Sequence, residues 1–197
     1  MRIWTTNLLA LSAMLCAATL VSGGSIAGKV AAGKGPSVVY VDTIAGKTFP
    51  APAKPVTMDQ KSLLFQPHLM VVLVGTSVDF KNSDKVQHNI FWPSISGNKK
   101  LGHNMGTWPS GESRNFKFDT PGTVSLLCNV HPEMSGYIVV SPTPYYAMTD
   151  DAGNFTIANV PDGSYSVIGW HEGFKSQTKP VSVAGDAKAE ADFSLSK

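Results

Sequence analysis

The chain has 197 residues, of which 43% are hydrophobic and only 15% are charged, and its formal net charge is +2. This composition is typical of a folded globular chain and excludes a disordered, highly charged one. The near balance of charges, with no basic run and no aromatic-basic cluster, excludes a nucleic-acid-binding protein.

Residues 1–23 have the pattern of a secretory signal peptide. Arg2 is the only charged residue before Lys29, and the apolar run 8–18 leads to small residues at 22–24. This run is shorter than the roughly 20 residues that a membrane-spanning helix needs. We therefore expect cleavage after Gly23 or Gly24, and a mature protein that is periplasmic or secreted and has no membrane span.

Short apolar or alternating runs follow along the chain, separated by Gly, Pro, Asn and Asp, and helical periodicity is almost absent. This pattern is typical of β-sandwiches. Pro-rich segments at 50–55 and 141–144 predict linkers, because proline cannot donate a hydrogen bond within a sheet. The run 69–74 is apolar at odd and even positions alike, so both faces of this strand are predicted to be buried. The predicted strands are 25–30, 37–42, 69–74, 77–82, 114–118, 123–128, 137–140, 155–157, 165–170, 181–183 and 191–195.

The end of the predicted strand 123–128 carries the most informative residues. Cys128, His131 and Met134 place a thiol, an imidazole and a thioether on one short loop, and His88 lies about forty residues upstream. Two His, one Cys and a weak Met are the ligand set of a blue-copper electron-transfer centre. After signal cleavage Cys128 has no cysteine partner within the chain, so a metal thiolate explains it better than an inert buried thiol.

The sequence offers three further candidate ligands. Glu133 could replace Met134 as an oxygen donor, and His103 and Met105 could ligate the metal or line the site. The sequence contains no Ser-His-Asp pattern, P-loop or Rossmann fingerprint, and a closed ligand set leaves no position for a substrate. The motifs therefore favour a protein that is not an enzyme.

Residues 56–144 resemble the cupredoxins, in particular plastocyanin, pseudoazurin and amicyanin. The resemblance rests on the turn 74–76, the strand 80–82, the pair 88–89, the turn 118–122 and the loop 128–136. It implies a Greek-key β-sandwich that binds one type 1 copper ion through the equatorial ligands His88, Cys128 and His131 and the axial ligand Met134. It also implies that Asn89 ties the two ligand loops together. In this family the edge of the C-terminal ligand His reaches solvent, so we expect electrons to leave through His131, ringed by apolar side chains such as Pro132, Met105 and Trp108.

The C-terminal segment resembles the carboxypeptidase regulatory-like (transthyretin-like) β-sandwich. In that family an initial Gly-rich strand normally precedes these motif residues directly, whereas here the matching strand is 24–30. We therefore expect a split sandwich, 24–55 and 145–197, around the cupredoxin domain 56–144; the alternative is that 24–55 extends the central block. The residues that carry the resemblance are Asp151, Gly153, Phe155, Asn159, Val160, Pro161, Gly163 and Tyr165.

These readings together predict an all-β, exported type 1 copper protein that carries single electrons between periplasmic partners. A c-type cytochrome or a periplasmic oxidoreductase is the expected partner. Two alternatives stay open. One is a copper-handling or storage protein, and the other is a carbohydrate- or protein-binding sandwich with an accessory copper domain.

Overall fold

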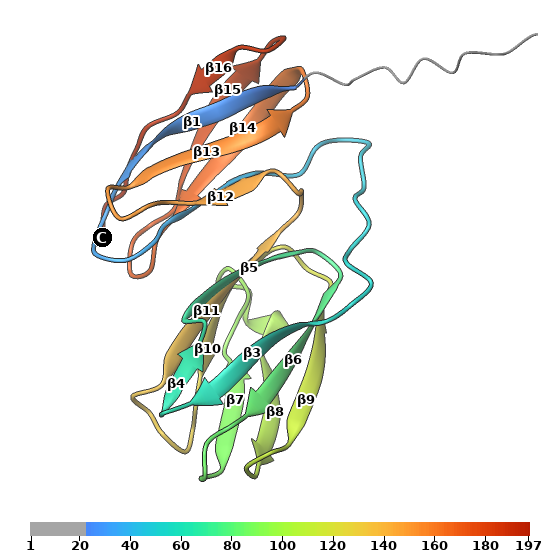
Figure 1. The fold of residues 1–197 in the computed structure, drawn as a ribbon, viewed down its shortest axis with the longest axis vertical. Helices are drawn as coiled ribbons and strands as arrows, with labels where there is room; N and C mark the ends of the chain where they lie inside the picture. Colours follow the sequence, from blue (N-terminus) through green and yellow to red (C-terminus); the bar gives the residue numbers. More distant parts are fainter. Residues whose placement is uncertain (1–22) are drawn as a thin grey trace, which may run out of the picture.

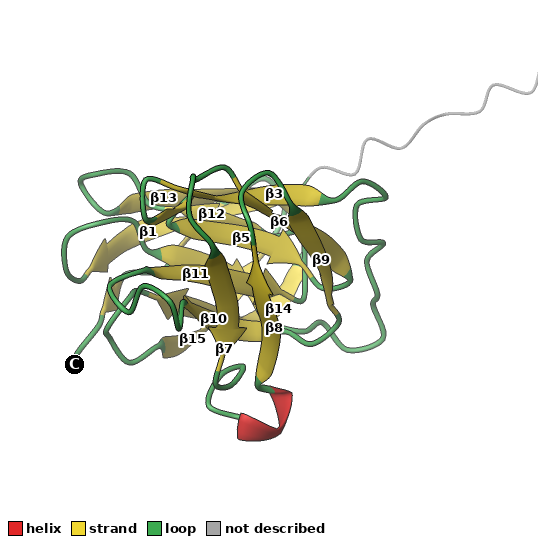
Figure 2. Ribbon diagram, turned by 90° about the horizontal axis from the view of Figure 1, so that it is seen from below, coloured by secondary structure: helices red, strands yellow, loops and turns green. Residues whose placement is uncertain are grey.

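The computed structural model describes residues 23–197, whose regular secondary structure is almost entirely β-strand. Figure 1 shows two β-sandwiches stacked along the long axis of the molecule. Within the described residues, helix is limited to one short 3-10 turn, η1 (Lys99–Leu101), drawn in red in Figure 2. The predicted all-β fold of two sandwiches is thereby confirmed. The predicted signal peptide lies outside the described residues except for Gly23.

The sandwich in the lower half of Figure 1 consists of two sheets, with strand orders β5-β11-β10-β7-β8 and β4-β3-β6-β9. The first sheet contains β5 (Leu69–Leu73), β7 (His88–Trp92), β8 (His103–Trp108), β10 (Gly122–Leu127) and β11 (Ser135–Ser141). The second contains β3 (Val56–Lys61), β4 (Leu64–Gln66), β6 (Thr76–Asn82) and β9 (Ser113–Phe118).

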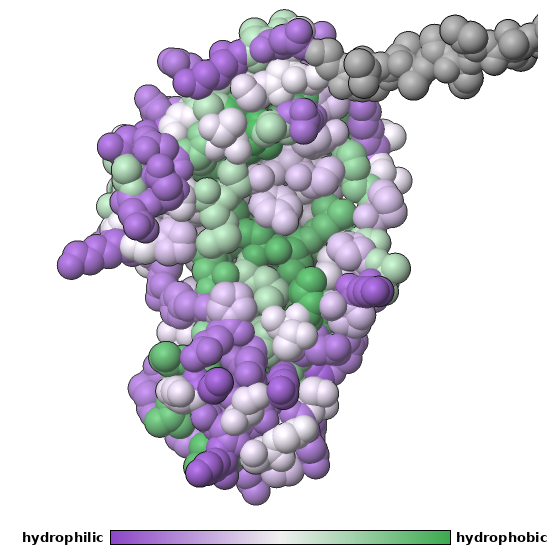
Figure 3. All heavy atoms as spheres, viewed as in Figure 1, coloured by the Kyte–Doolittle hydropathy of each residue, from purple (hydrophilic) through white to green (hydrophobic). Residues whose placement is uncertain are grey.

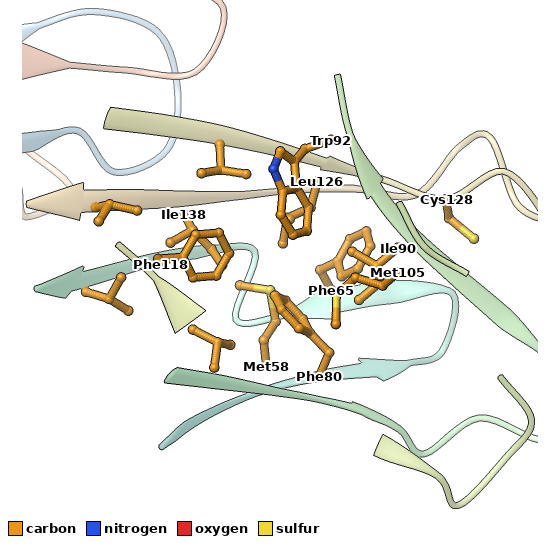
Figure 4. Packing of buried hydrophobic residues seen from close by; sticks show 14 of the residues in the cluster. Met58, Phe65, Phe80, Ile90, Trp92, Met105, Phe118, Leu126, Cys128 and Ile138 are labelled. Atoms are coloured by element: carbon orange, nitrogen blue, oxygen red, sulfur yellow. The ribbon is translucent and has the colours of Figure 1, made fainter. Parts of the chain in front are cut away.

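The inner faces of these two sheets form one hydrophobic core. In β6, alternate residues from Thr76 to Asn82 are buried, as expected for a strand with one face turned inward. Figure 4 shows the packed side chains, with Cys128 at one end of the core on the side of Ile90 and Met105. Such a core holds the strand ends, and therefore Cys128, in fixed positions.

The upper sandwich combines strands from both ends of the chain. Its sheets have the orders β13-β1-β16, with β17 also beside β1, and β12-β2-β14-β15. Strands β1 and β2 are thus hydrogen-bonded to strands that follow them by more than a hundred residues. The strands are β1 (Gly24–Ala31), β2 (Val38–Val41), β12 (Tyr146–Met148), β13 (Asn154–Val160), β14 (Gly163–Trp170), β15 (Gln177–Val183), β16 (Lys188–Glu190) and β17 (Phe193–Ser194).

A small buried cluster joins the two sandwiches. It consists of Val38, Tyr40 and Trp170 from the upper sandwich and Leu69 and Val139 from the lower one. Figure 3 shows hydrophobic residues gathered on this face where the sandwiches meet, with hydrophilic residues over the two ends. The junction therefore buries apolar surface from both units, as a domain core does.

Polar contacts extend the junction toward the ligand loop. His68 lies 2.7 Å from Glu172 of the upper sandwich through Nε2, and its Nδ1 lies 3.1 Å from the Ser135 carbonyl oxygen. Burial, with a hydrogen bond to Glu172 and the negative charge of that residue, raises the pKa of Tyr137 to about 12. Strand β11, which starts directly after Met134, is thus held on one side by the upper sandwich.

Four strands of the lower sandwich, β3, β4, β7 and β8, are absent from the sequence prediction. Polar residues at buried positions hide their alternation: Gln60 in β3 and His88 and Asn89 at the start of β7 are all buried. The prediction that 69–74 is buried on both faces is confirmed in part: Leu69 is buried in the junction cluster on one face, and Val72 is buried in the core of the lower sandwich on the other. β5 is an edge strand, and its residues Met70, Val71 and Leu73 are only partly buried.

Candidate metal centre

Two neighbouring strands bring the predicted ligands to one edge of the five-stranded sheet. β7 begins at His88, and β10 ends one residue before Cys128. Because these strands run antiparallel, the start of one lies beside the end of the other. The chain then turns tightly, and the Met134 amide donates to the His131 carbonyl at 3.0 Å. The fold therefore gathers residues that are far apart in the sequence.

His88, Cys128 and His131 converge on one point. Their ligand atoms all lie within 4.8 Å of one another. The two histidine Nδ1 atoms are 3.0 Å apart, and the rings meet at 61°. His88 is fully buried, Cys128 is 2% exposed and His131 is partly exposed. Two imidazole nitrogens and one thiol sulfur in this arrangement suit a copper ion.

Met134 and Glu133 differ in burial. Met134 is fully buried and belongs to the same hydrophobic cluster as Cys128. Glu133 is exposed. The two residues are adjacent on a tight turn, so their side chains point in different directions: that of Met134 into the protein and that of Glu133 into solvent. The structure thus favours the thioether over the carboxylate as the fourth donor.

Asn89 connects the two loops that carry the ligands. Its backbone N–H donates to Cys128 Sγ at 3.4 Å, and its side-chain Oδ1 accepts from the backbone N–H of Asn129 at 3.3 Å. Its Nδ2 donates to the Gly106 carbonyl at 2.8 Å. A hydrogen bond to a thiolate stabilises the charged form, and a fixed sulfur gives a fixed ligand geometry. Asn89 therefore has the linking role that the cupredoxin resemblance implied.

Asp84 is a site residue that the sequence analysis missed. Its Oδ2 lies 2.8 Å from His88 Nε2, the ring nitrogen that does not face His131. Partial desolvation tends to raise the pKa of this carboxyl, but hydrogen bonds from the Leu63 and Ser62 amides and from His88 outweigh it, so the pKa lies below its ordinary value. An anionic carboxylate at this nitrogen fixes the ring and leaves Nδ1 for the metal.

Replacing Asp84 with asparagine should weaken copper binding. The variant loses the charge that orients His88, and loss of such a partner typically costs about 10–100-fold in metal affinity. Competition titration against a copper chelator measures the change. Asp119→Asn is the matched control, because Asp119 pairs with Lys117 on the exposed surface. Equal affinities of the two variants would show that Asp84 does not support the ligand.

His103 lies away from the site, whereas Trp108 pairs with His88 in the sheet and Met105 belongs to the same buried cluster as Cys128. His103 pairs with Trp92 at the opposite end of β7 from His88, and its ring contacts Trp92. Met105 and Trp108 are buried in the core, at 9% and 1% exposure. The predicted apolar patch of Pro132, Met105 and Trp108 is therefore wrong in two members, because β8 is an edge strand that buries Met105 and Trp108 and not a loop over the site.

Two family models match the chain. The model of copper binding proteins of the plastocyanin/azurin family matches residues 53–141, and the carboxypeptidase regulatory-like domain matches residues 136–196. The plastocyanin of Scenedesmus fuscus is 33% identical over 89 residues, which cover 42% of this chain and 91% of that protein. Amicyanin-alpha of Methylorubrum extorquens is 29% identical over 90 residues, which cover 46% and 75%.

Solved structures give weaker likenesses. A reduced amicyanin variant is 20% identical with a TM-score of 0.42, covering 46% of this chain and 85% of that one. The Cu-containing nitrite reductase from Thermus scotoductus is 25% identical with a TM-score of 0.43, covering 52% of this chain and 25% of that one.

Fold and donor set together define a copper-binding β-sandwich protein. The chain belongs to the plastocyanin/azurin family of copper-binding proteins. The predicted cofactor, copper, is thereby confirmed, and so is the resemblance of its second sandwich to the carboxypeptidase regulatory-like domain.

Proposed function

We propose that the protein is an exported carrier of single electrons with one type 1 copper ion. His88, Cys128 and His131 are the equatorial ligands in this proposal, and Met134 is the weak axial ligand. The observation that carries it is the convergence of two imidazole nitrogens and one thiol sulfur at a largely buried point. Membership of a copper electron-transfer family supports it.

Copper in such a site supplies one reversible step between Cu(II) and Cu(I). The residues of the chain keep the ligands in one geometry for both states. Asn89 holds the sulfur of Cys128, Asp84 holds the ring of His88, and the sheet holds both strand ends. A rigid ligand set lowers the reorganisation that accompanies each transfer.

A carrier is favoured over an enzyme by the burial of the donors. His88 and Cys128 are almost inaccessible, and Met134 is buried below the turn. An enzyme site would need an open coordination position for its substrate. The partly exposed ring of His131, next to the 45% exposed Val130, is the proposed exit for the electron.

Location and domain organisation complete the proposal. The leader 1–23 directs the chain to the periplasm, where a c-type cytochrome or a periplasmic oxidoreductase is its partner. The mature chain consists of a regulatory-like sandwich, 24–55 and 145–197, split by the copper domain 56–144. Pairing of β1 with β13 and of β2 with β14 supports this split. Among residues 23–197, no helix is long and apolar enough to cross a membrane.

Stopped-flow mixing with a reduced c-type cytochrome tests the carrier function. We expect the cytochrome to be oxidised as the blue colour of the Cu(II) protein bleaches, with one electron per copper. Reoxidation should restore the colour through repeated cycles without release of copper to a chelator. Loss of copper on reduction, or no electron transfer, would favour copper storage instead.

Replacing Met134 with leucine should raise the reduction potential and keep the blue colour. The weak axial ligand tunes the potential of such centres, and its removal leaves a site that favours Cu(I). Voltammetry of the copper-loaded variant measures the shift. Met148→Leu is the control, because Met148 lies in β12 of the other sandwich and is 43% exposed. An unchanged potential in the Met134 variant would remove Met134 from the ligand set.

A further inference from the structure

The tip of the β3–β4 hairpin has an unusual backbone conformation. Lys61 pairs with Leu64, so only Ser62 and Leu63 form the turn, and both have left-handed φ angles of 57° and 59°. Glycine and asparagine normally occupy such positions, because a Cβ atom is disfavoured there. The Asp84 carboxylate accepts both turn amides, at 2.6 Å from Ser62 and 2.9 Å from Leu63. Asp84 therefore holds this turn in place.

The same carboxylate reaches the copper ligand. Asp84 Oδ2 accepts from Leu63 and also lies 2.8 Å from His88 Nε2. One oxygen atom thus links the backbone of the hairpin tip to the ring that faces the metal site. Electronic coupling decays more slowly through bonds and hydrogen bonds than across empty space. The route from Leu63 through Asp84 to His88 is therefore a short path for an electron.

This route opens onto a surface hollow of about 430 Å³. We call it the hairpin hollow. Its exposed apolar side chains include Leu63 at 40% and Val86 at 45%, and the neighbouring Leu64 is 55% exposed. The Asp84 side chain is 16% exposed, so the carboxylate forms part of the wall. The lining residues are Lys61, Ser62, Leu63, Ser83, Asp84, Lys85 and Val86.

Two lysines give the hairpin hollow its charge. Lys61 and Lys85 are exposed, and neither has an ion-pair partner within residues 23–197. The negative charge of Asp84 is already engaged by two amides and His88. A partner that covers the apolar side chains would meet two unpaired positive charges at the rim.

We propose that the hairpin hollow is a second electron port, separate from the His131 edge. Its partner is a redox protein with an apolar face rimmed by carboxylates around its own cofactor. With copper bound at His88, Cys128 and His131, one electron would pass from the partner's cofactor to the metal, or the reverse, and Asp84 and His88 would carry it without a proton moving between them. This inference rests on the proposed function of electron transfer.

Small charged reductants test this port without an identified partner. The Lys61→Glu/Lys85→Glu variant should react about tenfold more slowly with hexacyanoferrate(II) at low ionic strength, because the hollow loses its attraction for an anion. The same variant should react faster with the cation hexaammineruthenium(II). High salt should reduce both differences. Potentials measured for each variant correct the rates for driving force.

Two further variants make the comparison specific. Lys47→Glu/Lys175→Glu changes the net charge equally, at exposed lysines in the linker and in the upper sandwich, and should leave rates nearly unchanged. Val130→Glu places a negative charge beside His131 and measures the other port. If the hairpin variant matches the Lys47/Lys175 control while Val130→Glu is slow, the second port is refuted and the carrier function stands. If neither the parent protein nor any of the variants shows a type 1 copper spectrum, the proposed function itself fails.

Discussion

Replacing Cys128 with serine should abolish the intense visible absorption of the copper-loaded protein. That absorption comes from charge transfer between a thiolate and Cu(II), and serine offers no sulfur. Cys128 is the only cysteine within residues 23–197, and it lies at the point where the two histidines meet. Copper that still binds the two imidazoles should give only the weak colour of an ordinary Cu(II) complex.

Glu133→Gln is the control for the Cys128 variant. Glu133 lies in the same loop but is exposed, so its replacement should leave the colour unchanged. Absorption spectra of both variants, at matched copper content, decide the question. Intense colour in the Cys128→Ser protein would mean that another group is the principal ligand. A changed spectrum in the Glu133 variant would return its carboxylate to the candidate ligands.

Replacing Trp170 with alanine should destabilise the chain by about 3–5 kcal/mol, the usual cost of removing a large buried aromatic side chain. Trp170 is 7% exposed and packs at the junction, with its ring 5.4 Å from that of Tyr137. The cavity would remove packing contacts between β14 and β11, the strand that follows the ligand loop. Urea unfolding of the parent and variant proteins measures the loss of stability.

Tyr146→Ala is the control for Trp170. Tyr146 is 39% exposed, and replacing such a residue usually changes stability by no more than about 0.5 kcal/mol. A Trp170 variant as stable as the Tyr146 variant would contradict a shared core between the two sandwiches. Far-UV circular dichroism and fluorescence should follow the same transition in the parent if the junction couples the two units.

The candidate metal centre was largely predictable because its strongest signals are local. Cys128, His131 and Met134 lie within one turn, so their spacing alone indicated a common site. Asp84 carried a weaker signal, four residues before His88. A single carboxylate at this spacing is common in proteins, and only the fold shows that it meets His88 and the hairpin tip together. The junction contact between His68 and Glu172 joins residues from different sandwiches, and no local pattern indicates it.

Fold prediction succeeded where the alternation of hydrophobic residues was regular and failed where function interrupts it. β6 and β10 bury every second residue and were predicted closely. β7 begins with His88 and Asn89, which are polar but buried at the candidate metal centre. Two polar residues at its start hide the apolar pattern of a buried strand. Tertiary contacts stabilise such residues, and sequence patterns do not record those contacts.

An electron paramagnetic resonance spectrum of the copper-loaded, oxidised protein tests the central claim most directly. A copper ion bound by His88, Cys128 and His131 delocalises its unpaired spin onto sulfur, so we expect an unusually narrow copper hyperfine splitting together with intense blue colour. A wide splitting, as in a square-planar nitrogen and oxygen complex, would show that Cys128 does not bind the metal and would contradict the proposed electron carrier.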